Sequence, residues 1–408
     1  MSGNVLPYGH HSIDEHDIAA VIGVLRGEWL TTGPAVDAFE MALARLVEAP
    51  HAVVCASGTA ALHLAVLALG IGPGDVAVVP TLTFAATANC VRLAGGEVVF
   101  ADVDPETGLM RPEDFSAALK RAAGLRMRAV LPVHFAGQPA DMPALADIAR
   151  KAGLAIVEDA AHAIGTRYAD NAETAPIGAC RHSDLTTFSF HPVKTVTMAE
   201  GGAVTTADGT LARRLARLRG HGIERDGSRF VGIRSDAGAD LEATGPWTYE
   251  VQEVGLNYRA SDLHCALGLS QLAKLAGFIA RRQAIVARYD RQLAGLAPLL
   301  RPLGRVIGSE PAWHLYPVRV DFAALDCNRV DFMAALREHG VGTQVHYIPV
   351  HWQPYYRRRY GTLSLPNAEA YYRSALSLPL YPAMTDMDVD RVIDSVERVI
   401  GARSRSGT

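Results

Sequence analysis

Short apolar segments rich in β-branched residues recur through the first half of the chain, and amphipathic segments lie between several of them. The apolar segments predict buried β-strands, and the amphipathic segments predict helices. Strands that alternate with helices favour a mostly parallel sheet covered on both faces. The expected strands are His51–Cys55, Val76–Pro80, Glu97–Asp102, Arg128–Phe135, Leu154–Ala160, Leu185–Phe190 and Gly202–Thr206, and the expected helices are Ala60–Leu69, Pro112–Arg121 and Asp141–Lys151.

The second half of the chain has a different pattern. The segment Asp226–Pro246 is rich in Gly, Asp and Ser and predicts a long loop. A helix-period pattern begins at Ser261 and runs towards Leu293. These features predict a large α/β domain over residues 1–255 and a smaller α+β domain over residues 256–408. The smaller domain is expected to contain strands His314–Val320 and Gly342–Tyr347 and helices Arg329–His339 and Asp386–Ile400.

Composition narrows the possible classes of protein. The 408 residues are 49% hydrophobic and 20% charged, with a formal net charge of -4, so a nucleic-acid partner is not expected. The five cysteines are scattered and form no metal-binding motif, which predicts no metal site and a reducing compartment. No window approaches the roughly 18 apolar residues of a membrane span. We therefore expect a cytoplasmic protein with no membrane contact.

One lysine and one aspartate stand at the ends of two predicted strands. Lys194 follows the run Leu185–Phe190, and Asp159 lies near the end of the run Leu154–Ala160. In open α/β sheets the carboxyl ends of the strands border the ligand site, so both side chains are expected to face one site. A lysine can hold pyridoxal phosphate (PLP) as a Schiff base, and a carboxylate can keep the pyridine nitrogen protonated. The pair therefore predicts a PLP site with Lys194 and Asp159 as its catalytic residues.

Residues Ser57, Gly58 and Thr59 lie between a predicted strand and a predicted helix. Free N–H groups at a helix N-terminus, a glycine that allows close approach and side-chain hydroxyls together suit a phosphate group. The alternative is a plain helix cap. The presence of Lys194 and Asp159 favours the phosphate interpretation.

Two ring side chains follow the same strand ends. Phe84 comes shortly after the strand Val76–Pro80, where an aromatic ring can stack on a flat cofactor. His162 lies three residues after Asp159, within reach of the edge of the same ligand. Taken alone, Phe84 is a core residue and His162 is an ordinary structural histidine, so both assignments depend on the neighbouring motifs.

A combination of motifs resembles the DegT/DnrJ/EryC1/StrS sugar aminotransferases. The resemblance extends from about Pro7 to Ile400 and implies the type I fold of PLP-dependent transferases, with a large, mostly parallel α/β domain and a smaller C-terminal α+β domain. It also implies a transaminase activity. The motifs are Glu158–His162, Ser189–Lys194, Glu200–Gly202, Gly255–Arg259 and Ala266–Leu272.

The resemblance implies a role for each matching residue. Lys194 would carry the cofactor and shuttle the proton, and Asp159 would pair with the pyridinium nitrogen. Ser189, together with Gly58 and Thr59, would hold the phosphate.

Three further residues match positions around the cofactor in this family. His162 would approach the ring hydroxyl, where relatives often carry glutamine, and Phe84 would stack on the ring. Asn257 matches the residue that reaches the phosphate from the partner subunit, which implies a homodimer.

Within the family, the likeness is to the branch that makes UDP-4-amino-4,6-dideoxy-N-acetyl-β-L-altrosamine for pseudaminic acid, a sugar of cell-surface polysaccharides. The expected substrates are L-glutamate and UDP-2-acetamido-2,6-dideoxy-β-L-arabino-hex-4-ulose, which is aminated at C4. The diphosphate would bind Arg259 or the run Arg357–Arg359, and the sequence does not choose between them. The matching residues expected at the nucleotide-sugar site are Tyr8, Glu28, Trp29, Leu30, Thr31, His346, Tyr347, Ile348 and Pro349.

Three alternative functions compete with this interpretation. A PLP-dependent sugar dehydratase of the same family would carry histidine at the position of Lys194. A non-catalytic binding module has no need for Lys194, Asp159 and Ser189 together. A transaminase for another 4-keto or 3-keto nucleotide sugar, of the perosamine or bacillosamine type, is the hardest to separate, because sugar epimers differ by one or two hydrogen bonds.

Overall fold

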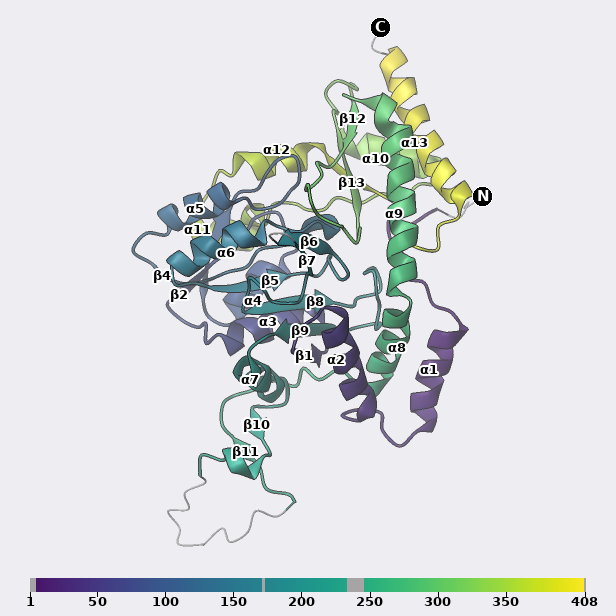
Figure 1. Cartoon of the computed structure of the whole chain (residues 1–408). Coiled ribbons are helices and arrows are strands. Elements are labelled where there is room, and N and C mark those ends of the chain that lie inside the picture. The colour runs from purple at the N-terminus through teal and green to yellow at the C-terminus, as the bar shows by residue number, and fades with distance from the viewer. Residues whose placement is uncertain (1–4, 171–172, 233–245, 407–408) are drawn as a thin grey trace.

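The computed structural model describes residues 5–170, 173–232 and 246–406, and a seven-stranded sheet forms its centre (Figure 1). The strand order is β1-β9-β8-β5-β4-β2-β3. β9 is antiparallel to both of its neighbours, and the other pairs are parallel, so the predicted mostly parallel sheet is confirmed. The strands are β1 (His51–Cys55), β2 (Asp75–Pro80), β3 (Glu97–Ala101), β4 (Arg126–Val130), β5 (Ala155–Asp159), β8 (Leu185–Ser189) and β9 (Gly202–Thr206).

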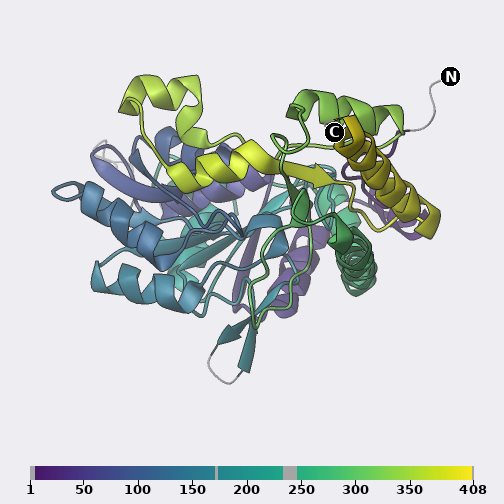
Figure 2. The same cartoon turned by 90° about the horizontal axis from the view of Figure 1, so that it is seen from above.

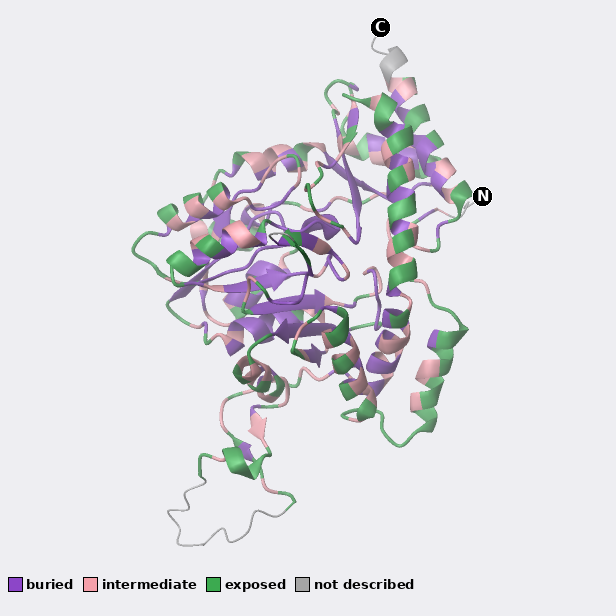
Figure 3. Cartoon of the chain, viewed as in Figure 1, coloured by how far each residue is buried: buried purple, intermediate pink, exposed green. Residues whose placement is uncertain are grey.

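Helices cover both faces of this sheet. Because successive strand residues point to opposite faces, Val78 belongs to one apolar core and Val79 to the other. Figure 3 shows the strands buried between layers whose outer sides are exposed. The first core includes residues of α2 (Pro34–Leu46), α5 (Pro112–Arg121), α6 (Met142–Lys151) and α8 (Asp262–Ala273), and the second includes residues of α3 (Gly58–Ala68), α4 (Ala86–Leu93), α7 (Gly209–Arg219) and α11 (Pro354–Tyr360).

A third apolar core lies beside the large sheet. It joins a three-stranded antiparallel sheet to three helices, and Leu6 from the N-terminal segment packs into it. Figure 2 shows α9, α10 and α13 to one side of the large sheet. The division of the chain near residue 255 stays a prediction. The elements of this core are β12 (Leu300–Pro302), β13 (Tyr316–Val320), β14 (Ala375–Leu378), α9 (Leu275–Gln292), α10 (Arg329–Glu338) and α13 (Asp386–Ser406). The helix α12 (Pro366–Ser374) packs instead in a smaller cluster with Phe135 and Leu315.

Three predicted elements differ from the structure. The helix expected from Ser261 to Leu293 is divided into α8 and α9 at Lys274, whose ammonium group contacts Asp17 on α1 (Glu15–Arg26) at 2.5 Å. The ion pair fixes this bend against a third helix. Among the described residues, no single helix is long and apolar enough to cross a membrane. The helix α8 and the segment Leu275–Leu296 reach the necessary length and apolar composition only when they are counted together, and the chain bends by 57° between them.

The other two differences concern strands. The strand expected over Arg128–Phe135 ends at Val130, since Pro132 has no N–H to donate to a neighbouring strand. The expected strand Gly342–Tyr347 is a loop, whose backbone pairs with β14 through an isolated bridge between Gln344 and Ser377. Leaving the sheet places the end of this loop at the cavity described below.

A narrow arm extends from the end of α7, away from the body of the molecule (Figure 1). It contains β10 (Ile223–Glu224), the short 3-10 helix η2 (Gly227–Arg229) and β11 (Glu250–Val251). Of the predicted loop Asp226–Pro246, residues 233–245 lie outside the described residues. The remaining elements are the hairpin of β6 (Arg167–Asp170) and β7 (Glu173–Pro176) and the 3-10 helices η1 (Phe135–Gly137), η3 (Leu293–Leu296) and η4 (Val350–Trp352).

Candidate active site

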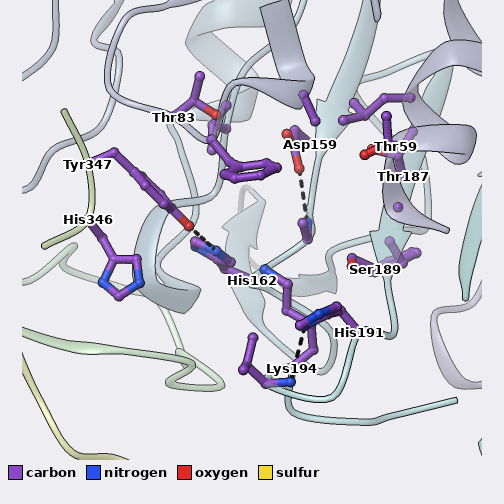
Figure 4. A pocket seen from close by; sticks show the side chains of 18 of the residues that line it. Thr59, Thr83, Asp159, His162, Thr187, Ser189, His191, Lys194, His346 and Tyr347 are labelled. Carbon is purple, nitrogen blue, oxygen red and sulfur yellow. Dashed lines mark hydrogen bonds between the residues drawn. The ribbon is translucent and has the colours of Figure 1, made fainter. Parts of the chain in front are cut away.

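A cavity of about 550 Å³ lies at the carboxyl ends of the parallel strands. Its lining comes from the N-terminus of α3, from the connections after β2, β5 and β8, and from the loop before η4. Figure 4 shows side chains from these segments directed into one space. The structure brings together these predicted site residues: Tyr8, Gly58, Thr59, Phe84, Asp159, His162, Ser189, Lys194, His346 and Tyr347.

Lys194 lies in the connection between β8 and β9. Its backbone N–H donates to the carbonyl of His191 at 2.8 Å, which closes a tight turn around the lysine. Burial lowers the pKa of its amine from 10.5 to about 8, while the negative charge of Asp159 opposes this shift. More of Lys194 is therefore neutral near physiological pH than for an ordinary lysine, and a neutral amine can act as a nucleophile or base.

Asp159 is the last residue of β5, and its carboxylate accepts two hydrogen bonds. The hydroxyl of Thr87 donates to Oδ2 at 2.7 Å, and the N–H of Ala161 donates to Oδ1 at 3.1 Å. These donors hold the buried carboxylate in one orientation. Sequence reasoning missed Thr87, which stands on α4 and carries no motif that links it to Asp159.

The N-terminus of α3 meets the end of β8 at very short range. A Cβ atom at Gly58 would lie 2.6 Å from the Cβ of Ser189 and 2.8 Å from its Oγ, so only glycine fits. The hydroxyl of Ser57 caps the helix by accepting from the N–H of Ala60 at 3.1 Å. The first N–H groups of a helix have no partner within it, and this first turn contains no acidic residue. The arrangement suits an anion such as a phosphate.

His162 contacts ring side chains on two sides. Its Nε2 lies 3.1 Å from the hydroxyl of Tyr347, and the ring of His314 packs at a centroid distance of 4.5 Å. Its Nδ1 is buried and has no hydrogen-bond partner among the described residues. His314 comes from the segment before β13 and was not predicted, because a lone histidine far along the chain gives no signal of this contact.

Aromatic side chains form the outer part of the cavity. The Phe84 side chain is 60% exposed although it is large and apolar, as expected for a ring that stacks on a flat ligand. Its nearest described ring is Tyr347, with centroids 6.1 Å apart. Tyr8 packs near His346, whose Nδ1 lies 2.8 Å from the hydroxyl of Ser377. Burial and the charge of Lys194 lower the pKa of His346 to about 3, so this imidazole is neutral.

The sequence model of the DegT/DnrJ/EryC1/StrS aminotransferase family matches residues 11–397. The chain belongs to this family. Helicobacter pylori PseC, an aminotransferase involved in the biosynthesis of pseudoaminic acid, is 27% identical and superposes with a TM-score of 0.85 over 98% of this chain and all of that chain. S. venezuelae DesV is 34% identical, with a TM-score of 0.81 over 98% of this chain and 99% of that chain.

A third solved relative bears on the cofactor. The PLP form of Spr1654 from Streptococcus pneumoniae, a putative sugar aminotransferase, is 28% identical with a TM-score of 0.85 over 98% of this chain and 99% of that chain. As a DegT/DnrJ/EryC1/StrS aminotransferase, the protein is a PLP-dependent enzyme that transfers an amino group to a sugar. The predictions of family, fold, enzyme class and cofactor are confirmed.

The geometry of this family member fits PLP on three independent observations. The approach of Gly58 to Ser189 forms a cradle that a side chain would fill. The orphaned Nδ1 of His162 lies in the cavity wall and lacks a partner that a ligand oxygen would supply. The Lys194 amine and the Asp159 carboxylate line the same cavity, so one ligand can reach both.

Seven predicted site residues do not reach this cavity. Asn257 is exposed in the loop before α8, where it bridges Gly220. The carbonyl of the next residue, Tyr258, accepts from the N–H of Ala56 at 2.8 Å, so this loop is tied to the residues just before the cradle. The other six, which are also absent from the cavity lining, are Glu28, Trp29, Leu30, Thr31, Ile348 and Pro349.

A second cavity, of about 660 Å³, lies between α7 and the arm. Thr31 and Arg259 line it together, and Glu224 is the one acidic residue in its described lining. The run Arg357–Arg359 is elsewhere, on α11, where Arg359 pairs with Glu97 at the sheet edge. No group of three His, Cys, Asp or Glu side chains within the described ranges could hold a metal ion. The other arginines of the second cavity are Arg213, Arg217, Arg225 and Arg229.

Proposed function

We propose that the enzyme moves the amino group of L-glutamate to C4 of UDP-2-acetamido-2,6-dideoxy-β-L-arabino-hex-4-ulose. The product would be UDP-4-amino-4,6-dideoxy-N-acetyl-β-L-altrosamine, an intermediate of pseudaminic acid biosynthesis, made in the cytoplasm for a cell-surface polysaccharide. The observation that carries the proposal is the position of Tyr8, His346 and Tyr347, which the sequence assigns to the sugar site, in the same cavity as Lys194. The whole-length similarity to PseC supports it.

Lys194 has two tasks in this proposal. PLP, when bound, acts as the electron sink for a carbanion formed at the amino-bearing carbon. Lys194 would hold PLP through Nζ and, when released by the amino donor, move the proton between the substrate carbon and the cofactor. Its lowered pKa supports the second task because proton abstraction requires the neutral amine. The position in a tight turn supports the first, since the backbone of the lysine is fixed.

Asp159 and the cradle would orient the cofactor at its two ends. The Asp159 carboxylate is assigned to the ring nitrogen, where it would keep a proton in place and strengthen the electron sink. The hydroxyl of Ser189 and the first N–H groups of α3 at Gly58 and Thr59 are assigned to the phosphate. A cofactor held at both ends would keep its ring in one position next to Phe84. This fixed position would favour reaction at one carbon.

The sugar would lie at the outer part of the cavity, against Tyr8 and His346. Both groups are neutral at pH 7, because burial raises the pKa of Tyr8 and lowers that of His346. Neutral hydroxyl and imidazole groups can discriminate the hydroxyls of a sugar by hydrogen bonds, each worth roughly 1 kcal/mol. The charge of the diphosphate needs another partner.

We propose that this partner comes from the second subunit of a homodimer. Asn257 and Arg259 are on the same exposed loop, and the cavity beside Arg259 is lined by five arginines in all. Arginine side chains recognise phosphate through paired N–H donors. The run Arg357–Arg359 is the weaker candidate, since its helix α11 lies outside both cavities.

The deciding experiment offers the purified enzyme a set of 4-keto sugars with glutamate as donor. The set contains UDP- and dTDP-linked sugars, including the L-arabino compound and substrates of the perosamine and bacillosamine type. We expect at least about tenfold higher kcat/KM for the L-arabino UDP sugar, with product stereochemistry read by NMR. A preference for a dTDP-linked or D-configured sugar would reject the pseudaminic acid assignment while leaving the aminotransferase assignment intact.

A further inference from the structure

His162 is held firmly, yet one of its two nitrogens has no partner. The ring of Tyr347 lies nearly parallel to the imidazole, at 22°, with centroids 6.1 Å apart. The ring of His314 packs against it from another direction. Nε2 is 3.1 Å from the hydroxyl of Tyr347, while Nδ1 is buried without a partner among the described residues. A buried polar atom left unpaired is costly, which points to a ligand atom as its partner.

The charge state of His162 limits where its proton can be. Burial, together with the positive charge of Lys194 and the nearby His346, lowers the pKa of His162 well below its usual value. The pKa of the adjoining His314 is lowered in the same way, by burial first. The imidazole of His162 is therefore neutral at pH 7 and carries one N–H and one acceptor nitrogen. The remaining question is which nitrogen donates.

Tyr347 decides between the two arrangements. Burial raises the pKa of its hydroxyl, so the group keeps its proton. Within the described ranges, the Tyr347 hydroxyl has Nε2 of His162 as its hydrogen-bond partner. The hydroxyl can satisfy its proton by donating to Nε2, which makes Nε2 the acceptor. The proton of the neutral imidazole is then on Nδ1, the atom that lacks a partner.

We propose that Tyr347 is a positioning residue that acts through His162. Its hydroxyl selects the Nδ1–H tautomer and thereby makes His162 a hydrogen-bond donor to the ring oxygen of the bound cofactor. A donor at that oxygen stabilises its anionic form. The glutamine that relatives often carry at this position donates through an amide and needs no tautomer to be selected. The inference rests on the proposed placement of PLP between Asp159 and Lys194.

Nitrogen NMR on the full-length holoenzyme tests the tautomer directly. The protein is labelled with ¹⁵N-histidine, and the His162 signals are identified by their loss in His162→Gln. In the wild type we expect Nδ1 to be protonated and Nε2 to be unprotonated. Tyr347→Phe, which keeps the ring, should produce the opposite tautomer or a mixture. Tyr371→Phe is the matched control, because its buried hydroxyl has no hydrogen-bond partner in the described part of the chain, and it should leave the His162 signals unchanged.

A pH titration of the visible absorption of the holoenzyme tests the consequence. Loss of a hydrogen bond to an anionic oxygen should raise the midpoint of the titration by about one pH unit in Tyr347→Phe. In the His162→Gln background the same substitution should have no further effect, since the amide needs no partner at Tyr347. An unchanged tautomer and midpoint in Tyr347→Phe, or an equal shift in both backgrounds, would overturn the inference. Neither readout involves the sugar, so the substrate assignment can fail separately.

Discussion

At the scale of single residues, the site depends on contrasting surroundings for two ionisable side chains. Lys194 is placed where burial favours its neutral form. Asp159 ends β5, the strand that pairs with β8. Its carboxylate accepts hydrogen bonds from the hydroxyl of Thr87 and the N–H of Ala161, and these donors favour the charged form. The two groups line one cavity, as the proposed roles of proton carrier and partner of a positive ring nitrogen require.

Replacement of the lysine tests the first group. In Lys194→Ala, turnover with glutamate should fall by at least about 10³-fold, because the proton shuttle is lost. The variant should stay folded and bind PLP noncovalently, since the phosphate cradle is formed by other residues. Steady-state kinetics and equilibrium dialysis measure the two effects. Activity close to that of the wild type would remove Lys194 from the mechanism.

The pKa of Lys194 also predicts how stability depends on pH in the cofactor-free protein. An unfolded lysine titrates near 10.5 and the folded one near 8, so between these values the unfolded chain binds more protons. The free energy of unfolding should therefore rise with pH through this window, by about 3 kcal/mol at most. Urea unfolding of wild type and Lys194→Met isolates the contribution, which the variant lacks. A pH-independent difference between the two proteins would contradict it.

Asp159→Asn tests the second group. Asparagine keeps the shape and one acceptor oxygen, but it cannot hold a proton on the ring nitrogen by charge. We expect kcat to fall by about 10²- to 10³-fold, with a smaller effect on the free energy of unfolding. Kinetics and urea unfolding of the same preparation separate the two. If the loss lies mainly in stability, Asp159 is a structural residue at the end of β5.

At the scale of elements, the sequence predicted best where one local pattern decides the outcome. β1 and β9 lie at their predicted bounds, because a short apolar run between turn residues suffices to define a buried strand. Lys194, Asp159 and Gly58 were found in the same way, through motifs at strand and helix ends. The contacts of Thr87 and His314 could not be predicted, since α4 and the segment before β13 bring them in through tertiary packing alone.

The errors have the same origin. The pattern from Ser261 to Leu293 is continuous in sequence, but the chain bends at Lys274, between α8 and α9. The segment Gly342–Tyr347 was predicted as a strand, yet its last four residues line the cavity. The hydrophobic pattern of a segment predicts that it is buried, but it does not predict which other segment packs against it.

A glycine pair tests the role assigned to α3. A Cβ at Gly58 would overlap Ser189, so Gly58→Ala should weaken PLP binding at least about tenfold and cost about 1–3 kcal/mol in stability. Gly277→Ala in α9 is the matched control, because no atom lies within 4 Å of its added Cβ. The control should leave PLP binding unchanged and add up to about 1 kcal/mol of stability. Equal PLP affinity in both variants would place the phosphate elsewhere.

At the scale of the whole molecule, the second subunit of the proposed homodimer would cover the arm and the loop that contains Asn257. The arm exposes large apolar side chains, with Trp247 75% and Val251 62% accessible. Val254, between the arm and the loop, is 92% accessible. Large apolar side chains gathered in one exposed segment are typical of protein interfaces, so these residues support the proposed homodimer.

Mixed dimers give the sharpest test of this assembly. Lys194→Ala and Asn257→Ala protomers, each inactive alone, are unfolded and refolded together in equal amounts. About a quarter of wild-type activity should return, because half of the dimers are mixed and each mixed dimer contains one intact site. The refolded single variants serve as controls. A fully active monomer in sedimentation at assay concentration would exclude a shared site.

The pairing of β1 with β9 has a consequence for how the chain reaches its native state. Cys55 and Gly202 are partners in this ladder, and through them the phosphate cradle comes next to the turn that carries Lys194. Contacts between residues so far apart in sequence form late in folding, since a long loop has to close first. We therefore expect the lysine and the cradle to come together late in folding. Stable attachment of PLP thus marks a newly synthesised chain as one whose central sheet is complete.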